Sequence, residues 1–218
     1  MKAIAIDGPS GVGKSTVSKE IARALNFLHV DTGALYRAVA LHALRSGIPV
    51  SLIVSKLENI KISLKFNKFD QKVFLNDKDV TQFLRSEKVS NLASKISKIK
   101  EVRKFLLETQ RNIALNNNVV MDGRDIGTVV LPNADIKIFL TAKPQIRAKR
   151  RFLEMKQKGN EVVTYEQVLN DIIKRDRTDT ERKISPLHPA TSAVILDVSD
   201  TEVNQVVKNI ISICKAII

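Results

Sequence analysis

A single cysteine, Cys214, and no tryptophan occur in this sequence. One cysteine cannot form an internal disulfide or a thiolate metal cluster, so we expect Cys214 to pack as a small apolar residue in the last helix. The three histidines, His29, His42 and His188, do not have metal-ligand spacing, and we expect them at the surface or in the core. These absences exclude a disulfide-stabilised scaffold and give no support to a zinc site.

Long apolar runs are also missing from the sequence. No run approaches the ~18 residues that a membrane-spanning helix needs. The apolar N-terminal stretch is too short for a signal peptide, and Asp7 closes it. We therefore expect a cytoplasmic protein without a membrane partner. Its 218 residues, of which 44% are hydrophobic, are enough for one α/β domain with a small insert.

Positive charge is in excess, with a formal net charge of +13. Such a balance suits polyanionic partners, including nucleic acid. Much of the excess is lysine distributed over amphipathic helices, which usually indicates a solvated face. A nucleic-acid-binding protein is therefore one alternative, and it would show tight, salt-sensitive binding. We expect only weak, nonspecific retention and no specific nucleic-acid partner.

Short apolar runs alternate with amphipathic segments of helical length. The runs that read as buried strands are residues 2–6, 28–30, 119–121, 136–140 and 194–198. The helical segments lie near 14–25, 34–46, 102–117, 144–158, 164–182 and 203–216. This alternation predicts an α/β fold with a five-stranded parallel sheet and helices on both faces. Ligands of such folds bind beyond the carboxyl ends of the strands.

Residues 51–100 break this rhythm. Alternating apolar residues at 60–66 predict a half-exposed strand, and the apolar residues 73–75 after a polar turn suggest a hairpin. Apolar residues between 89 and 99 fall at helical spacing. We therefore predict a small α+β insert at 51–100 on an α/β core formed by residues 1–50 and 101–218.

A phosphate-binding loop follows the first predicted strand. Residues 8–16 read GPSGVGKST and match the pattern G-x-x-x-x-G-K-[ST] in full. Glycines let the backbone turn its N–H groups toward phosphate oxygens, and the helix that starts near Lys14 adds its positive end. The Lys14 ammonium reaches the β- and γ-phosphates, and the Ser15 hydroxyl can hold Mg²⁺. The predicted ATP-binding residues of this loop are Gly8, Pro9, Ser10, Gly11, Val12, Gly13, Lys14, Ser15 and Thr16.

Three classes of P-loop protein compete: small-molecule kinases, GTPase switches and larger ATPases that act on nucleic acid. A GTPase uses N-K-x-D to read guanine, and residues 67–70 read NKFD, but no D-x-x-G lies between residues 16 and 66. The larger ATPases usually have a long apolar strand that ends in two acidic residues. The segment VVMDGRD has one such acid, Asp122, which is followed by Gly123 and the basic Arg124. These features favour a small-molecule kinase, which needs a second anion site when its acceptor is phosphorylated.

Arginines lie where such a second anion site is expected, on segments that follow the strands. Arg37 comes one turn into a helix that Thr32 can cap. Arg124 follows the third buried strand, within the run Asp122-Gly123-Arg124-Asp125. Since the P-loop lies at the same edge of the sheet, this pair of arginines favours a second phosphate site.

Two more arginine groups lie in the C-terminal third of the chain. Residues 175–182 read RDRTDTER, in which Arg175, Asp179 and Arg182 share one helix face. Arg147, Arg150 and Arg151 form a face of the preceding helix. Surface salt bridges are the alternative interpretation of both groups.

Taken together, these segments resemble bacterial cytidylate kinases. The resemblance rests on GPSGVGKST, DTGALYR, the NLAS segment, DGRDIGTVVLP and RDRTDTER, and it covers nearly the whole chain. It implies transfer of the γ-phosphate of ATP to CMP or dCMP, with Mg²⁺. It also implies that residues 1–50 and 101–218 form a P-loop kinase core and that the insert at 51–100 binds the acceptor nucleotide. Thr32 departs from the family pattern, in which many members have serine, but the hydroxyl is kept.

The resemblance also implies roles for the individual residues. Catalysis would depend on Lys14, Arg124 and Arg182. The acceptor nucleotide would be bound by Thr32, Tyr36, Arg37, Ser94, Arg103, Asp122, Gly123, Arg124, Asp125, Arg175, Asp179 and Arg182. Within this set, the acceptor phosphate would fall to Thr32, Arg37, Arg124 and Arg182, and the sugar to Arg175 and Asp179. A mobile lid at about 147–163 would bring Arg147 and Arg151 to the ATP phosphates and exclude water.

Cytosine recognition would fall to Ser94, Arg103 and Asp125. A carboxylate can accept from the exocyclic amine of cytosine, and an arginine can donate to its ring acceptor and carbonyl. Uracil would place a carbonyl against the carboxylate, and such unpaired buried groups make discrimination steep. A kinase for UMP, AMP or a non-nucleotide acceptor is the enzyme alternative. We expect a monomer, because one chain supplies a complete site.

Replacing Lys14 tests the P-loop assignment. We expect Lys14→Ala to abolish phosphoryl transfer and to leave the fold intact, because the ammonium acts on the ATP phosphates. A coupled assay for ADP and a far-UV circular dichroism spectrum measure the two effects. Transfer at close to the wild-type rate would contradict the assignment.

Overall fold

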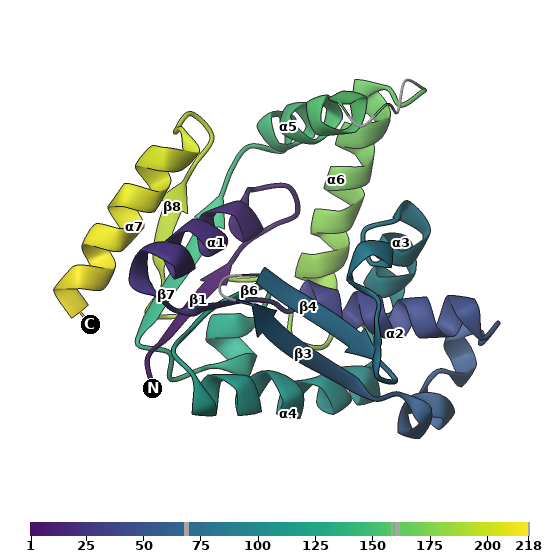
Figure 1. The fold of residues 1–218 in the computed structure, drawn as a ribbon. Coiled ribbons are helices and arrows are strands. Elements are labelled where there is room, and N and C mark those ends of the chain that lie inside the picture. The colour runs from purple at the N-terminus through teal and green to yellow at the C-terminus, as the bar shows by residue number, and fades with distance from the viewer. Residues whose placement is uncertain (68–69, 158, 160–161, 218) are drawn as a thin grey trace.

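A five-stranded parallel sheet lies at the centre of the computed structural model, which describes residues 1–67, 70–157, 159 and 162–217 (Figure 1). Its strands follow the spatial order β2-β6-β1-β7-β8. Their bounds are Ala3–Asp7 for β1, Leu28–Asp31 for β2, Val119–Gly123 for β6, Ile136–Thr141 for β7 and Val194–Asp197 for β8. All five predicted strands are confirmed, and so is the parallel sheet.

Helices cover both faces of this sheet, as the alternation in the sequence predicts (Figure 1). Ile4 and Ile6 of β1 pack in one cluster with residues of α1 (Lys14–Leu25) and α7 (Val203–Ile217). Ala5, between them, belongs to a second cluster that includes Ala114 of α4 (Lys100–Asn116). Successive side chains of a strand point to opposite faces, so a strand buried on both faces is apolar throughout.

The segment predicted as an insert forms its own small antiparallel sheet, in the order β3-β4-β5. The bounds are Ile62–Asn67 for β3, Asp70–Leu75 for β4 and Lys78–Asp79 for β5. Asn76 and Asp77 have positive φ angles of 48° and 64°, which suit the tight turn between β4 and β5. The predicted hairpin is confirmed, and the short strand β5 is an addition to it.

Short helical turns and one α-helix complete this segment. The 3₁₀ turns are Val50–Leu52, Val54–Asn59 and Thr81–Phe83, and α3 spans Glu87–Ile96. Ile53 and Ile96 are fully buried in one cluster with Leu35 of α2 (Gly33–Arg45) and Leu106 of α4. The segment therefore shares its core with α2 and α4, and the domain boundaries near 51 and 100 stay predictions.

Helices α5 (Pro144–Gln157) and α6 (Tyr165–Glu181) pack against each other through Ala148, Val168 and Ile172. A capping box at Thr164 and Gln167 begins α6. The predicted lid at 147–163 falls here, and its residues 158, 160 and 161 lie outside the described residues. None of the described helices is long and apolar enough to cross a membrane.

The parallel arrangement brings three chain segments to one edge of the sheet. Strands β1, β6 and β2 are neighbours and end at Asp7, Gly123 and Asp31. The P-loop, the DGRD run and the start of α2 therefore follow these strands at adjacent positions. This is the edge at which the sequence predicts both anion sites.

Candidate active site

The P-loop runs from β1 to α1 in a conformation that depends on glycine. Gly8, Gly11 and Gly13 have φ angles of 148°, 73° and 98°, which side chains rarely tolerate. A Cβ on Gly8 would lie 2.2 Å from the carbonyl oxygen of Leu140 on β7. Gly13 precedes α1 without any capping side chain, so the N–H groups of the first turn stay available to an anion.

Lys14 lies against this loop. Its Nζ donates to the carbonyl oxygens of Gly8 and Pro9, each at 2.8 Å, and the residue is only 7% exposed. Burial, reinforced by the nearby charge of Arg124, holds the pKa of the ammonium well below its usual value. A phosphate oxygen would relieve both unfavourable effects, so this position suits a lysine that binds phosphate.

Arg147 connects the P-loop to α5 and α6. Its guanidinium donates to the carbonyl oxygens of Ser10 at 2.9 Å and Ala142 at 2.8 Å. The same group binds both carboxylate oxygens of Asp176 on α6, at 3.0 and 2.5 Å. Arg147 is 3% exposed and is engaged by protein groups, so its contact with ATP stays a prediction.

The other two arginines of the predicted lid, Arg150 and Arg151, contact other groups than Arg147 does. Arg150 donates to the carbonyl oxygens of Val198 and Ser199, beyond the end of β8. Arg151 is exposed and pairs with Glu154 at 3.0 Å. The three arginines of this predicted helix face therefore have different partners, and ATP binding by Arg151 stays a prediction.

Asp7 links the P-loop strand to the DGRD segment. Its two carboxylate oxygens accept from the backbone N–H groups of Ile126 at 2.8 Å and Gly127 at 2.7 Å. These groups belong to the π-helical turn Ile126–Val130, which directly follows the DGRD run. Burial raises the pKa of Asp7 to about 6, although the two N–H donors act in the opposite direction. No pattern in the sequence indicates this contact.

Arg37 is held at the end of β2 by Asp31. The Arg37 Nη2 and the Asp31 Oδ2 are 2.6 Å apart, and Asp31 Oδ1 accepts from the backbone N–H of Ala34. The carboxylate of Asp31 therefore supports the first turn of α2. The expectation that the Thr32 side chain caps this helix is wrong, since its hydroxyl donates to the Asp122 carbonyl at 2.8 Å.

Arg124 and Arg182 gather around a second carboxylate, Asp179. Arg124 Nε donates to Asp179 Oδ2 at 2.8 Å, and Arg182 Nη1 lies 3.9 Å from Asp179 Oδ1. Burial alone would raise the pKa of Asp179, but these arginines outweigh it and hold the pKa below its usual value. Arg182 is the C-cap residue of α6 and has an extended backbone conformation, so α6 ends at Glu181.

Asp125 is the third carboxylate of the cluster. It is buried and hydrogen-bonded to Arg103, and it lies 3.8 Å from Arg182. The Arg103 guanidinium also lies 5.5 Å from the centre of the Tyr36 ring. Arg103 further donates to the carbonyl oxygen of Ser97, whose hydroxyl donates to the carbonyl oxygen of Ser94. Hydrogen bonds thus connect the three predicted base-reading residues, and their role in reading the base stays a prediction.

Unpartnered cationic donors remain in this cluster. Among the described residues, Arg37 Nε and Arg182 Nη2 are buried without a hydrogen-bond partner. Burial and the charge of Arg124 lower the pKa of Arg175 to about 10. Five arginines here face three aspartates: Arg37, Arg103, Arg124, Arg175 and Arg182 with Asp31, Asp125 and Asp179. The excess of positive charge and of donors fits a doubly charged phosphate.

Sequence reasoning missed two polar contacts near these residues. His29 Nε2 and Asp122 Oδ1 form a buried hydrogen bond of 2.7 Å, which fixes the carboxylate of Asp122. Gln71 of β4 accepts from the backbone N–H of Asp31 at 2.9 Å and donates to the Asp31 carbonyl at 3.2 Å. Each contact joins residues far apart in the sequence, and a single sequence carries no signal for either.

Comparison with known proteins decides the family. A family model described as "Cytidylate kinase" matches residues 4–216. The chain belongs to the cytidylate kinase family. It is 47% identical over 213 residues to the cytidylate kinase of Caldicellulosiruptor saccharolyticus, covering 96% of this chain and 94% of the relative. It is 48% identical over 210 residues to that of Caldanaerobacter subterraneus subsp. tengcongensis, covering 95% and 92%.

This cytidylate kinase family member also shares its fold with more distant kinases. Shikimate kinase from Bacteroides thetaiotaomicron aligns over 98% of both chains with a TM-score of 0.52, at 13% sequence identity. That likeness concerns the fold alone. The family resemblance inferred from the motifs is confirmed, and the chain is a phosphotransferase of the cytidylate kinase family.

The pKa of Asp7 predicts a pH dependence of the stability of this cytidylate kinase family member. Because the pKa rises from 3.8 to about 6 on folding, the folded state binds the proton more tightly. The resulting stabilisation is fully present below pH 3.8 and is lost as the pH rises through about 6. Asp7→Asn cannot titrate, so the stability of the wild type relative to this variant should fall by about 2 kcal/mol from pH 4 to pH 7.

Urea unfolding of both proteins across this pH range measures the difference. Comparing them at each pH removes the contribution of all other titrating groups, apart from those that interact directly with Asp7. A difference in the free energy of unfolding that does not change with pH would contradict the raised pKa.

Proposed function

We propose that this chain transfers the γ-phosphate of ATP to CMP or dCMP, giving ADP with CDP or dCDP. One observation carries the proposal: a cluster of arginines with unpartnered donors adjoins a P-loop at the same edge of one sheet. A phosphoryl donor and a phosphorylated acceptor can therefore meet end to end. Membership of the cytidylate kinase family supports cytosine as the acceptor base.

The donor half of the site would use the P-loop. The backbone N–H groups of residues 8–16 would surround the ATP phosphates, and Lys14 would bind the β- and γ-phosphates. Lys14 already lies against the loop through the carbonyl oxygens of Gly8 and Pro9. A phosphate bound in the loop would replace these carbonyl contacts of the ammonium.

Mg²⁺ would bind near the start of α1. The Ser15 hydroxyl lines a cavity that Asp31 also lines, and such oxygen ligands suit Mg²⁺. Among the described residues, no group of three or more His, Cys, Asp or Glu forms a ready-made metal site. None is needed, because Mg²⁺ usually keeps several waters and binds one or two protein oxygens together with substrate phosphates. It would neutralise charge on the transferred phosphate.

The acceptor phosphate would bind Thr32, Arg37, Arg124 and Arg182. Asp31 and Asp179 hold Arg37 and Arg124 in place, so the guanidinium groups are oriented before the substrate arrives. Arg37 Nε and Arg182 Nη2 supply free donors. Arg175 and Asp179 would bind the sugar, and Tyr36 would line the pocket beside Arg103.

Cytosine would be read by Ser94, Arg103 and Asp125. The carboxylate would accept from the exocyclic amine, and the guanidinium would donate to the ring nitrogen and the carbonyl. In the structure Arg103 and Asp125 bind each other. Cytosine would exchange this contact for one with each partner, whereas uracil would leave a carbonyl facing Asp125.

Chemistry at this site would depend on positioning and charge. No general base is required when the acceptor is a phosphate, because arginines and Lys14 can stabilise the charge that spreads over the transferred group. Closure of a lid at about 147–163 over the P-loop would exclude water and bring Arg147 and Arg151 to ATP. We also propose that the protein acts as a monomer, since one chain supplies both anion sites.

A panel of nucleoside monophosphates tests the proposal. With ATP as donor, we expect CMP and dCMP to be far better acceptors than UMP or AMP in a coupled assay for ADP. Asp125→Ala should lower kcat/KM for CMP by about 100-fold or more, as expected for a lost charged hydrogen-bonding partner. The loss for UMP should be much smaller.

Two results would count against this account. A wild-type preference for UMP or AMP would overturn the acceptor assignment. Equal losses for CMP and UMP in Asp125→Ala would show that Asp125 does not read the base. Glu108→Ala removes an exposed carboxylate on α4 and serves as the control, with kcat/KM expected to stay within about twofold of the wild type.

A further inference from the structure

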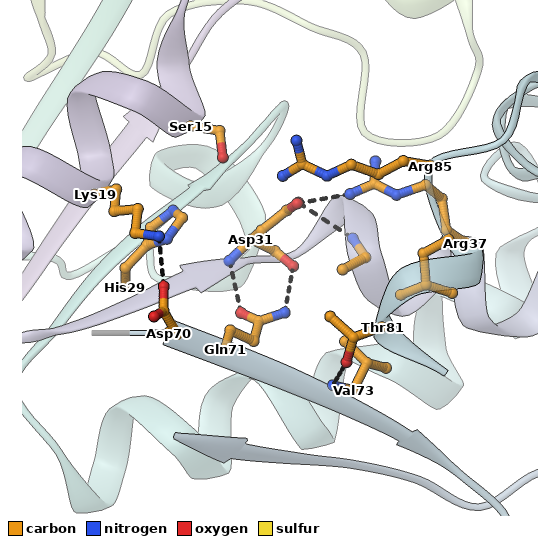
Figure 2. A pocket seen from close by; sticks show the side chains of 12 residues that line it. Ser15, Lys19, His29, Asp31, Arg37, Asp70, Gln71, Val73, Thr81 and Arg85 are labelled. Carbon is orange, nitrogen blue, oxygen red and sulfur yellow. Dashed lines mark hydrogen bonds and ion pairs between the residues drawn. The ribbon is translucent and has the colours of Figure 1, made fainter. Parts of the chain in front are cut away.

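A cavity of about 130 Å³ lies between α1, the end of β2 and the insert (Figure 2). Several of the side chains that line it can donate hydrogen bonds to an anion, among them Ser15, Lys19, Arg37 and Arg85. Three of these carry positive charge, and Asp31 and Asp70 line it as well. Arg37 is already part of the proposed phosphate site, and Lys19 is paired with Asp70. Arg85 has no proposed role so far, and among the described residues no carboxylate forms an ion pair with it.

The Arg85 guanidinium is uncommitted. Among the described residues it makes no hydrogen bond and no ion pair, whereas Arg37 binds Asp31 at 2.6 Å and Lys19 binds Asp70 at 2.5 Å. Figure 2 shows the Arg85 side chain running beside that of Arg37 and pointing toward Asp31. Its charge is one of those that hold the pKa of Asp31 below the usual value against the effect of burial. Arg85 therefore extends into the site with free donors.

Arg85 also has an informative place in the chain. It directly precedes Ser86, whose hydroxyl caps α3 by accepting from the N–H of Val89. The same helix carries Ser94, the proposed base-reading residue. Any shift of α3 onto the base would therefore move Arg85 with it, so one element can contact both ends of an acceptor nucleotide.

We propose that Arg85 is a further binding residue for the phosphate of the acceptor nucleotide. The proposal rests on the proposed function and adds a contact from the insert to those from the core. A planar guanidinium can bind two phosphate oxygens at once. Beside Arg37, whose Nε is buried without a partner, Arg85 would give the dianionic phosphate a second fork of donors.

The position of the cavity favours the acceptor over ATP. Of the P-loop residues, only Ser15 lines it, whereas residues of β2, α2 and the insert form most of its wall. Lys14 and the loop N–H groups, which would bind the ATP phosphates, lie on the other side of Ser15 in the chain. Arg85 should therefore affect affinity for the acceptor and leave affinity for ATP unchanged.

Equilibrium binding tests this assignment without turnover. The full-length wild type, Arg85→Ala, Arg85→Lys and the control Lys88→Ala would each be titrated separately with CMP and with a non-hydrolysable ATP analogue by calorimetry. Lys88 is an exposed cation on α3, and it does not line the cavity. We expect Arg85→Ala to bind CMP at least about tenfold more weakly, as for the loss of a charge-assisted contact.

The other variants distinguish a specific contact of Arg85 with CMP from a general effect of positive charge on affinity. Arg85→Lys should recover part of the affinity for CMP, because lysine keeps the positive charge but lacks the planar guanidinium that binds two oxygens at once. Lys88→Ala should bind CMP like the wild type, and all four proteins should bind the ATP analogue with equal affinity. A melting temperature for each protein checks that the fold is kept, and Arg85→Lys carries the test should Arg85→Ala not fold.

Three outcomes would overturn the inference. These are unchanged CMP affinity in Arg85→Ala, an equal loss in Lys88→Ala, and a loss of affinity for the ATP analogue that matches the loss for CMP. Failure of the proposed function looks different, because the wild type would then bind another monophosphate in preference to CMP. In that case the same variants are titrated with that monophosphate, and the same outcomes decide on Arg85.

Discussion

Buried and half-buried carboxylates hold like-charged guanidinium groups together at one edge of the sheet, and the rest of the site depends on this. Asp31 holds Arg37, Asp179 holds Arg124, and Asp125 binds Arg103. Without these carboxylates, mutual repulsion and burial would drive the arginines apart or into solvent. With them, the groups stay close, and the donors without a protein partner are available to an anion. The arrangement is oriented before a substrate binds, which lowers the cost of binding a phosphate.

The same carboxylates connect segments that a phosphoryl transfer has to coordinate. Asp125 follows β6, Asp179 lies on α6, and Asp31 ends β2. Two further contacts fix the P-loop relative to them: Asp7 binds the turn that follows the DGRD run, and Arg147 binds Ser10 and Asp176. The proposed donor and acceptor sites thus share a framework of polar contacts. The insert adds elements to that framework through α3, so recognition of the base can be coupled to binding of its phosphate.

Much of the fold could be predicted from the sequence, because strands buried on both faces leave short apolar runs and the P-loop leaves a specific pattern of glycines. The arginine cluster could be predicted in part, since strand ends in a parallel sheet converge. The polar contacts that hold the site residues in place could not be predicted. His29 and Asp122 are 93 residues apart and Gln71 and Asp31 are 40 apart, and only the folded chain brings them together. Arg147 was expected to face ATP, but the sequence could not reveal that Asp176 and the P-loop carbonyl engage it.

The central claim is that two anion sites adjoin, so that donor and acceptor phosphates meet end to end. A single molecule that joins adenosine and cytidine through five phosphates would occupy both sites at once, and its dissociation constant tests the claim most directly. Because the second site then binds intramolecularly, we expect this compound to bind at least about 100-fold more tightly than either ATP or CMP alone. Binding no tighter than that of ATP would contradict the account, since the two sites would then be too far apart or wrongly oriented to be spanned.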